Sequence, residues 1–134
     1  MTPLPDAALV VRGGQNLSAH FAQGSGVTVD ADGGIQDVSV NCAADVSVQE
    51  LTALNRDTGY PGLPHNQIGV TTVGAIRAAG GDVVPAPTRT NPYHATLSGL
   101  TPEQACQLFR RTIRHPNTRP RAAGQRDDSS QSVC

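Results

Sequence analysis

Apolar residues occur in short stretches separated by glycine and proline, which predicts several short elements. Residues 7–11 form a continuous, partly β-branched apolar run, the pattern of a buried strand. Residues 26–30 and 35–41 alternate between apolar and polar positions on either side of Asp32-Gly33-Gly34. This pattern predicts a β-hairpin. In its second strand we expect Val38 and Val40 to face the core.

Three more strands and four helices are expected along the chain. The strands are predicted over residues 68–70, 82–84 and 93–98. Each predicted helix follows a residue whose side chain can cap it, and the capping residues are Asn16, Ser47, Thr72 and Thr101. The helices are expected over residues 17–23, 47–54, 72–79 and 101–113.

This order of elements predicts an α+β fold with a mixed, mostly antiparallel sheet and three to four short helices. A regular alternation of strand and helix is lacking, which disfavours a doubly wound sheet. Apolar periodicity stops after residue 113, where proline, serine and arginine dominate. We therefore expect a single compact domain over residues 1–113 and a flexible, arginine-rich tail over residues 114–134.

Composition limits both the core and the partners. Tryptophan is absent and there are only two Phe and two Tyr, so Val, Leu, Ile and Ala must fill the interior. The few scattered rings disfavour a surface for stacking bases. All ten basic residues are arginines, and six of them lie between Arg110 and Arg126 without an acidic residue. Because guanidinium groups suit phosphates, this segment predicts contact with nucleic acid.

The three cysteines, Cys42, Cys106 and Cys134, form no Cys-x-x-Cys pair. Their number and spacing argue against a disulfide scaffold and against structural zinc, so we expect Cys42 and Cys106 to be packing residues. The first ten residues lack the basic region of a signal peptide, and no stretch approaches the roughly 20 apolar residues that cross a bilayer. We expect a protein that contacts no membrane and acts in the cytoplasm, its own or that of a target cell into which it is delivered.

His94 is the strongest candidate for acid–base chemistry. The predicted strand around it places His94, Thr96 and Ser98 on one side, because residues two apart in a strand share a face. An imidazole beside two hydroxyls can transfer a proton and orient a substrate. An ordinary solvent-facing strand has the same pattern. The two glutamates, Glu50 and Glu103, lie in the first turns of predicted helices, where capping and charge already explain them.

Ser39 and Asn41 form a second polar row on the outer side of the hairpin strand. If the sheet brings this row beside His94, the two rows form one site with His94, Ser39 and Ser98 as catalytic candidates. No group of His, Cys and Asp has metal-ligand spacing, so no metal is predicted.

Arg12 follows the first predicted strand and precedes Gly13-Gly14. We expect its guanidinium at the rim of the sheet, where the two glycines would let a phosphate approach the backbone. The free N–H groups of the helix that follows Asn16 would favour an anion. A simple strand-to-helix turn with an exposed arginine explains the same residues.

Val10-Val11-Arg12-Gly13-Gly14, followed about 25 residues later by Val38-Ser39-Val40-Asn41, resembles the opening of ADP-ribosyltransferase-type domains of bacterial toxins. In that family an arginine on the first strand holds NAD, and a serine-containing strand shapes the nicotinamide pocket. The resemblance implies NAD as substrate and implicates Arg12 and Ser39. In such an enzyme we expect Arg12, Gly13, Gly14 and Asn41 to bind NAD, with Ser39 at the ribose. The resemblance covers about a third of the chain. The family's closing glutamate has no counterpart here. Under the resemblance, either His94 with Tyr93 takes its place, or the activity is altered or lost.

Three functions remain open. The first is a small bacterial toxin-like enzyme that uses NAD, as a transferase or a hydrolase. The second is a metal-independent ribonuclease toxin in which His94 is the acid or base and Ser98 or Thr96 binds the phosphate. The third is a non-enzymatic binding or immunity module whose arginine tail folds on an acidic partner. Either toxin would have a cognate antitoxin or immunity protein as partner.

Overall fold

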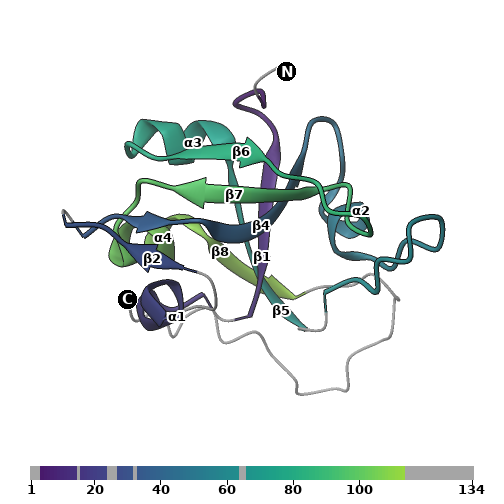
Figure 1. Ribbon diagram of the computed structural model, residues 1–134, viewed down its shortest axis with the longest axis horizontal. Coiled ribbons are helices and arrows are strands. Elements are labelled where there is room, and N and C mark those ends of the chain that lie inside the picture. Colours follow the sequence, from purple (N-terminus) through teal and green to yellow (C-terminus); the bar gives the residue numbers. More distant parts are fainter. Residues whose placement is uncertain (1–3, 15, 24–26, 32, 64–65, 114–134) are drawn as a thin grey trace.

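Six strands form one sheet in the order β6-β7-β4-β1-β5-β8, and every neighbouring pair is antiparallel. The computed structural model describes residues 4–14, 16–23, 27–31, 33–63 and 66–113 (Figure 1). The strands are β1 Leu9–Gly13, β4 Val38–Ala43, β5 Gln67–Thr72, β6 Asp82–Pro85, β7 His94–Ser98 and β8 Arg110–Ile113. The α+β class and the antiparallel sheet are confirmed, while the predicted tail at 114–134 lies outside the described residues.

The predicted hairpin exists, but its second strand divides between two sheets. β2 (Thr28–Val29) and β3 (Ile35–Gln36) form a separate two-stranded sheet. The chain then bends at Asp37, whose φ of 61° is left-handed, and continues as β4 in the large sheet. The backbone N–H of Asp37 donates to the Ser98 hydroxyl at 3.1 Å, which stabilises this bend. Val38 and Val40 face the core as predicted.

The four helices are α1 (Ser18–Gln23), α2 (Val48–Thr52), α3 (Val73–Ala78) and α4 (Pro102–Leu108). The side chains of Ser47, Thr72 and Thr101 cap the last three, as predicted. α4 ends at Leu108, whereas the sequence predicted a helix to residue 113. Residues 110–113 instead pair with β5 as strand β8. This pairing satisfies the backbone groups that β5 would otherwise expose at the edge of the sheet.

Apolar residues pack on both faces of the sheet. The larger cluster joins the sheet to α1, α3 and α4, and it includes Phe21 and Phe109 with ring centroids 5.5 Å apart. On the other face, Leu51 of α2 packs against Val11 and Ile68 of the sheet and forms a smaller cluster. In Figure 1, α2 lies at the right-hand end of β4 and β7, beside the loop that joins β6 to β7. The polar end of β7 is therefore next to a helix that covers only part of this face.

Gly69 in the middle of β5 provides a test of this packing. A Cβ atom there would lie 2.7 Å from Asn16 Nδ2 and 2.8 Å from Phe109 Cβ. We expect Gly69→Ala to lower the free energy of unfolding by about 1–3 kcal/mol, because both neighbours are buried. Gly74→Ala is the control: its Cβ would lie 3.0 Å from Asp6 Cβ and 3.2 Å from the Asp6 carbonyl oxygen, a less severe contact at an exposed residue, and alanine favours helix α3. Urea unfolding of both variants measures the difference, and an equal or smaller loss in Gly69→Ala would contradict this packing.

Candidate functional site

The imidazole of His94 and the hydroxyl of Ser39 meet on neighbouring strands. His94 pairs with Asn41, and Ser39 pairs with Thr96, so all four residues share one face of the sheet. His94 Nε2 lies 3.2 Å from Ser39 Oγ. Ser39 is exposed and His94 is half-buried, so a substrate in solution could reach both side chains. The two polar rows expected from the sequence therefore lie side by side.

The other ring nitrogen of His94 is fixed by the backbone. Nδ1 lies 2.8 Å from the carbonyl oxygen of Ala86, which can only accept a hydrogen bond. In the neutral imidazole the proton is therefore on Nδ1, and Nε2 accepts from the Ser39 hydroxyl. The Ala86 N–H also donates to the His94 carbonyl at 2.9 Å, so the residue that orients the ring is itself held by β7. Nε2 is therefore unprotonated and can take a proton from a hydroxyl group.

Asn91 holds the loop that carries Ala86, and the sequence analysis missed this role. The Asn91 side chain is buried and donates from Nδ2 to Asn41 Oδ1 at 2.9 Å. Its Oδ1 accepts from the Tyr93 backbone N–H, and its own N–H donates to the Thr88 hydroxyl, each at 3.0 Å. In the sequence, Asn91 stands before a proline, which by itself favours a turn. A buried asparagine partner could not be identified without the fold.

Asn41 lies on the predicted face of β4, the same face as Ser39, but it is buried beneath the site. It is 4 % exposed, and its Nδ2 donates to the Leu51 carbonyl at 2.7 Å and to the Tyr60 hydroxyl at 3.0 Å. Its hydrogen bonds to these groups and to Asn91 support the site from below. Its burial was not predicted, because the contact with α2 is not visible in the local sequence.

Ser98 also has a structural partner, because its hydroxyl accepts the Asp37 N–H. It stands four residues along β7 from His94 and stabilises the bend before β4. The Ser39 hydroxyl is therefore the one found next to the imidazole, and Ser98 is not.

Tyr93 and Glu50 form a second polar pair near the start of β7. The Tyr93 hydroxyl donates to Glu50 Oε2 at 2.5 Å. This hydrogen bond to a carboxylate raises the pKa of the Tyr93 hydroxyl. The sequence placed Glu50 in a capping box. The Glu50 backbone N–H does donate to Ser47 Oγ, but its carboxylate reaches Tyr93 instead.

Arg12 lies on the opposite face of the sheet from His94 and Ser39. Val11 pairs with Asn41, and Asn41 pairs with His94, so these three residues share a face. Arg12 is the next residue along β1 and points the other way. Its guanidinium lies over the ring of Phe21, 4.6 Å from the centroid, in the region of the larger apolar cluster. The expected meeting of Arg12 with Ser39 and His94 is therefore not found.

The glycines after Arg12 do not form the predicted phosphate-binding turn. The Gly14 N–H donates to the Gln67 carbonyl at 2.8 Å, and Gly13 pairs with Ile68 in the sheet. Asn16 does not turn its side chain toward the helix, because Nδ2 donates back to the carbonyls of Arg12 and Gly14. The Gly14 N–H group, which the predicted phosphate site would need, is therefore occupied by the first residue of β5.

The two described cysteines are not candidates for nucleophiles. Burial raises the pKa of the Cys42 thiol to about 11, which disfavours the reactive thiolate. Cys106 is also buried, but its sulfur is part of a disulfide, so the expectation that it is only a packing residue was wrong.

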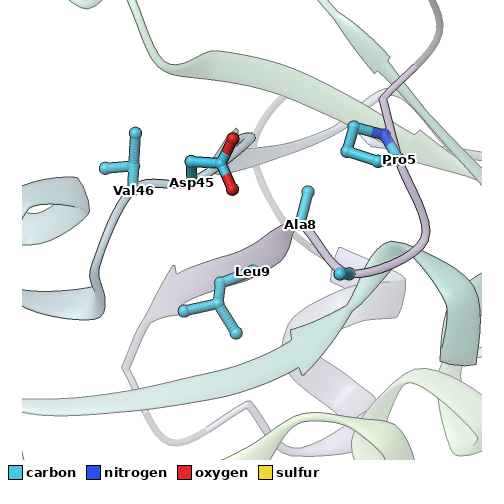
Figure 2. A pocket seen from close by; sticks show the side chains of 6 residues that line it. Pro5, Ala8, Leu9, Asp45 and Val46 are labelled. Atoms are coloured by element: carbon cyan, nitrogen blue, oxygen red, sulfur yellow. The ribbon is translucent and has the colours of Figure 1, made fainter.

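A separate cavity of about 160 Å³ lies between the segment before β1 and the turn after β4 (Figure 2). Its walls are formed by Pro5, Ala7, Ala8, Leu9, Asp45 and Val46. None of the residues predicted for the site lines it, and it is smaller than the roughly 300–1,000 Å³ typical of small-molecule sites. Across the described ranges, no three His, Cys, Asp or Glu residues are grouped as metal ligands. No helix in the same part of the chain is long and apolar enough to span a membrane.

Asn91 gives a test of how the site is held. We expect Asn91→Ala to lower the free energy of unfolding by about 1–3 kcal/mol, because Asn41 Oδ1 would lose its donor in a buried position. Asn66→Ala is the control, since Asn66 is exposed, and it should change stability by less than about 0.5 kcal/mol. Urea unfolding checks both. If Asn91→Ala left the free energy of unfolding unchanged, the buried amide network would not hold this loop.

No protein-family model matches this chain, and neither a curated protein nor a solved structure matches it. The candidate function is therefore argued from the arrangement of residues around His94.

Proposed function

We propose that this protein is a metal-independent ribonuclease in which His94 is the acid–base residue. The observation that carries the proposal is the direction of the imidazole: Nδ1 contacts the Ala86 carbonyl, and Nε2 faces the exposed hydroxyl of Ser39. Because Nε2 accepts a hydrogen bond from the Ser39 hydroxyl, it can accept one from another hydroxyl in the same position. The 2′-hydroxyl of RNA would take the place of the Ser39 hydroxyl at Nε2.

The chemistry follows from this replacement. Nε2 removes the proton of the 2′-hydroxyl, whose oxygen attacks the neighbouring phosphorus. The bond between phosphorus and the 5′-oxygen breaks, and the 5′-oxygen leaves with a proton from solvent. The products are a 2′,3′-cyclic phosphate and a free 5′-hydroxyl. DNA lacks the 2′-hydroxyl and cannot follow this route.

Phosphate binding would come from groups around the imidazole. Thr96 pairs with Ser39 on the same face, so both hydroxyls can donate to a phosphate oxygen. Arg89 is exposed in the loop that carries Ala86, and within the described part of the chain it has no acidic partner. Arg110 lies in β8, an edge strand that β4, β1 and β5 separate from β7, so Arg110 would contact RNA away from the cleaved bond.

The NAD-using enzyme has less support. The resemblance to ADP-ribosyltransferases implies that Arg12 and Ser39 act on one bound NAD, yet they lie on opposite faces of the sheet. The ribonuclease needs only residues that lie near His94. Its biological role as a toxin, with a cognate antitoxin or immunity protein, extends the same proposal.

The test is cleavage of cellular RNA in excess EDTA, followed by gel electrophoresis and identification of the 3′ ends. We expect cleavage with 2′,3′-cyclic phosphate ends, and His94→Ala should lower the rate by about 100- to 10,000-fold. The control is His20→Ala, since His20 is exposed in α1 and should leave the rate unchanged.

Ser39→Ala tests whether the serine hydroxyl is only replaced by the 2′-hydroxyl of RNA or is itself the nucleophile. If the 2′-hydroxyl replaces it at Nε2, the rate should change by less than about tenfold. A loss as large as in His94→Ala would make Ser39 the nucleophile and contradict the proposed mechanism. Absence of cleavage by the wild-type protein would overturn the ribonuclease, and release of nicotinamide from NAD would favour the NAD-using enzyme in its place.

A further inference from the structure

The guanidinium of Arg12 is held in one position by its neighbours. Nη1 donates to Asn16 Oδ1 at 2.9 Å, and the group lies over the Phe21 ring. Asn16 is completely buried, and its Nδ2 donates to the carbonyls of Arg12 and Gly14. Because both N–H groups of that amide are used, the oxygen must face Arg12. The position of the cation is thus set before any ligand binds.

Among the described residues, no carboxylate pairs with Arg12, although a desolvated cation normally has such a partner. Arg12 is half-buried, and loss of solvent lowers the pKa of its guanidinium. Arg77, by contrast, contacts Asp6 at 2.8 Å and Asp82 at 3.0 Å. Aromatic and amide contacts stabilise a cation but do not neutralise it.

Most of the N–H groups of the Arg12 guanidinium also have no acceptor among the described residues. A guanidinium carries five N–H groups in a flat fork that matches two oxygens of one anion. Asn16 accepts from one of them, and no other acceptor for this group is found within the described ranges. The remaining edge can therefore bind a phosphate or a carboxylate through paired hydrogen bonds.

We infer that Arg12 is a binding site for a compact oxyanion, a phosphate or carboxylate group of a ligand. The site is separate from His94, because the two residues lie on opposite faces of the sheet. It supplies charge and paired donors but no acid–base group, so its role is binding and not catalysis. The inference does not depend on the proposed ribonuclease.

The experiment is a titration of the ¹⁵N-arginine-labelled protein with sodium phosphate, with sodium acetate as a second arm and sodium chloride as the control for ionic strength. We expect the Arg12 Nε resonance to shift and saturate with phosphate or acetate but not with chloride. The Arg77 resonance should stay unchanged, because that guanidinium is already paired. Saturation by phosphate alone would identify a phosphate site, and saturation by acetate alone would identify a carboxylate site. An Arg12 resonance that responds to neither anion would overturn the inference.

Variants connect this signal to the residue. Arg12→Lys keeps the charge but loses the fork, and we expect phosphate or acetate to bind at least tenfold more weakly in calorimetry. Arg77→Gln is the matched control and should bind as the wild type does. The titration is repeated in His94→Ala, where the Arg12 response should persist. If it disappears there, the anion binds at His94 and the separate site is wrong. If the Arg12 resonance did not respond to either anion while the protein still cleaved RNA, the anion site would be wrong and the proposed ribonuclease would stand.

Discussion

The buried amide of Asn41 is the contact on which the arrangement around His94 depends. It joins strand β4 to α2 through the Leu51 carbonyl, to the loop after α2 through Tyr60, and to the β6–β7 loop through Asn91. A buried polar group costs free energy unless it is hydrogen-bonded, so the four segments are stable only in a geometry that satisfies this amide. Asn91 transmits that geometry to the loop that carries Ala86, and Ala86 orients His94.

The register of the sheet decides which polar residues can act together. Side chains of directly paired residues share a face, and a shift of one residue exchanges the faces. His94, Asn41 and Val11 are connected by such pairs, which puts Arg12 on the reverse side. The result is two separate polar sites. An imidazole lies beside a hydroxyl on one face, and on the other face a guanidinium lies over an aromatic ring, without a carboxylate partner among the described residues.

The sequence predicted the features that depend on local chemistry. Capping residues located α2, α3 and α4, and the two-residue period along β7 showed that His94 and Thr96 share a face. Three errors have a common origin in long-range contacts. The end of α4 became β8 because β5 offered an edge, Asn41 is buried because α2 covers it, and the Gly14 N–H is used by Gln67. The pairing of His94 with Ser39 needed a register that no local pattern contains. Asn91 was missed because its partner is 50 residues away.

The proposed chemistry requires that His94 presents an unprotonated Nε2 to a hydroxyl group while Nδ1 carries the proton. Long-range ¹H–¹⁵N correlation of the wild-type protein at a pH where the imidazole is neutral distinguishes the two tautomers. We expect a single tautomer with the proton on Nδ1, which persists in Ser39→Ala because the Ala86 carbonyl fixes it. A proton on Nε2, or a mixture of both tautomers like that of a free imidazole, would show that the ring is not oriented in this way.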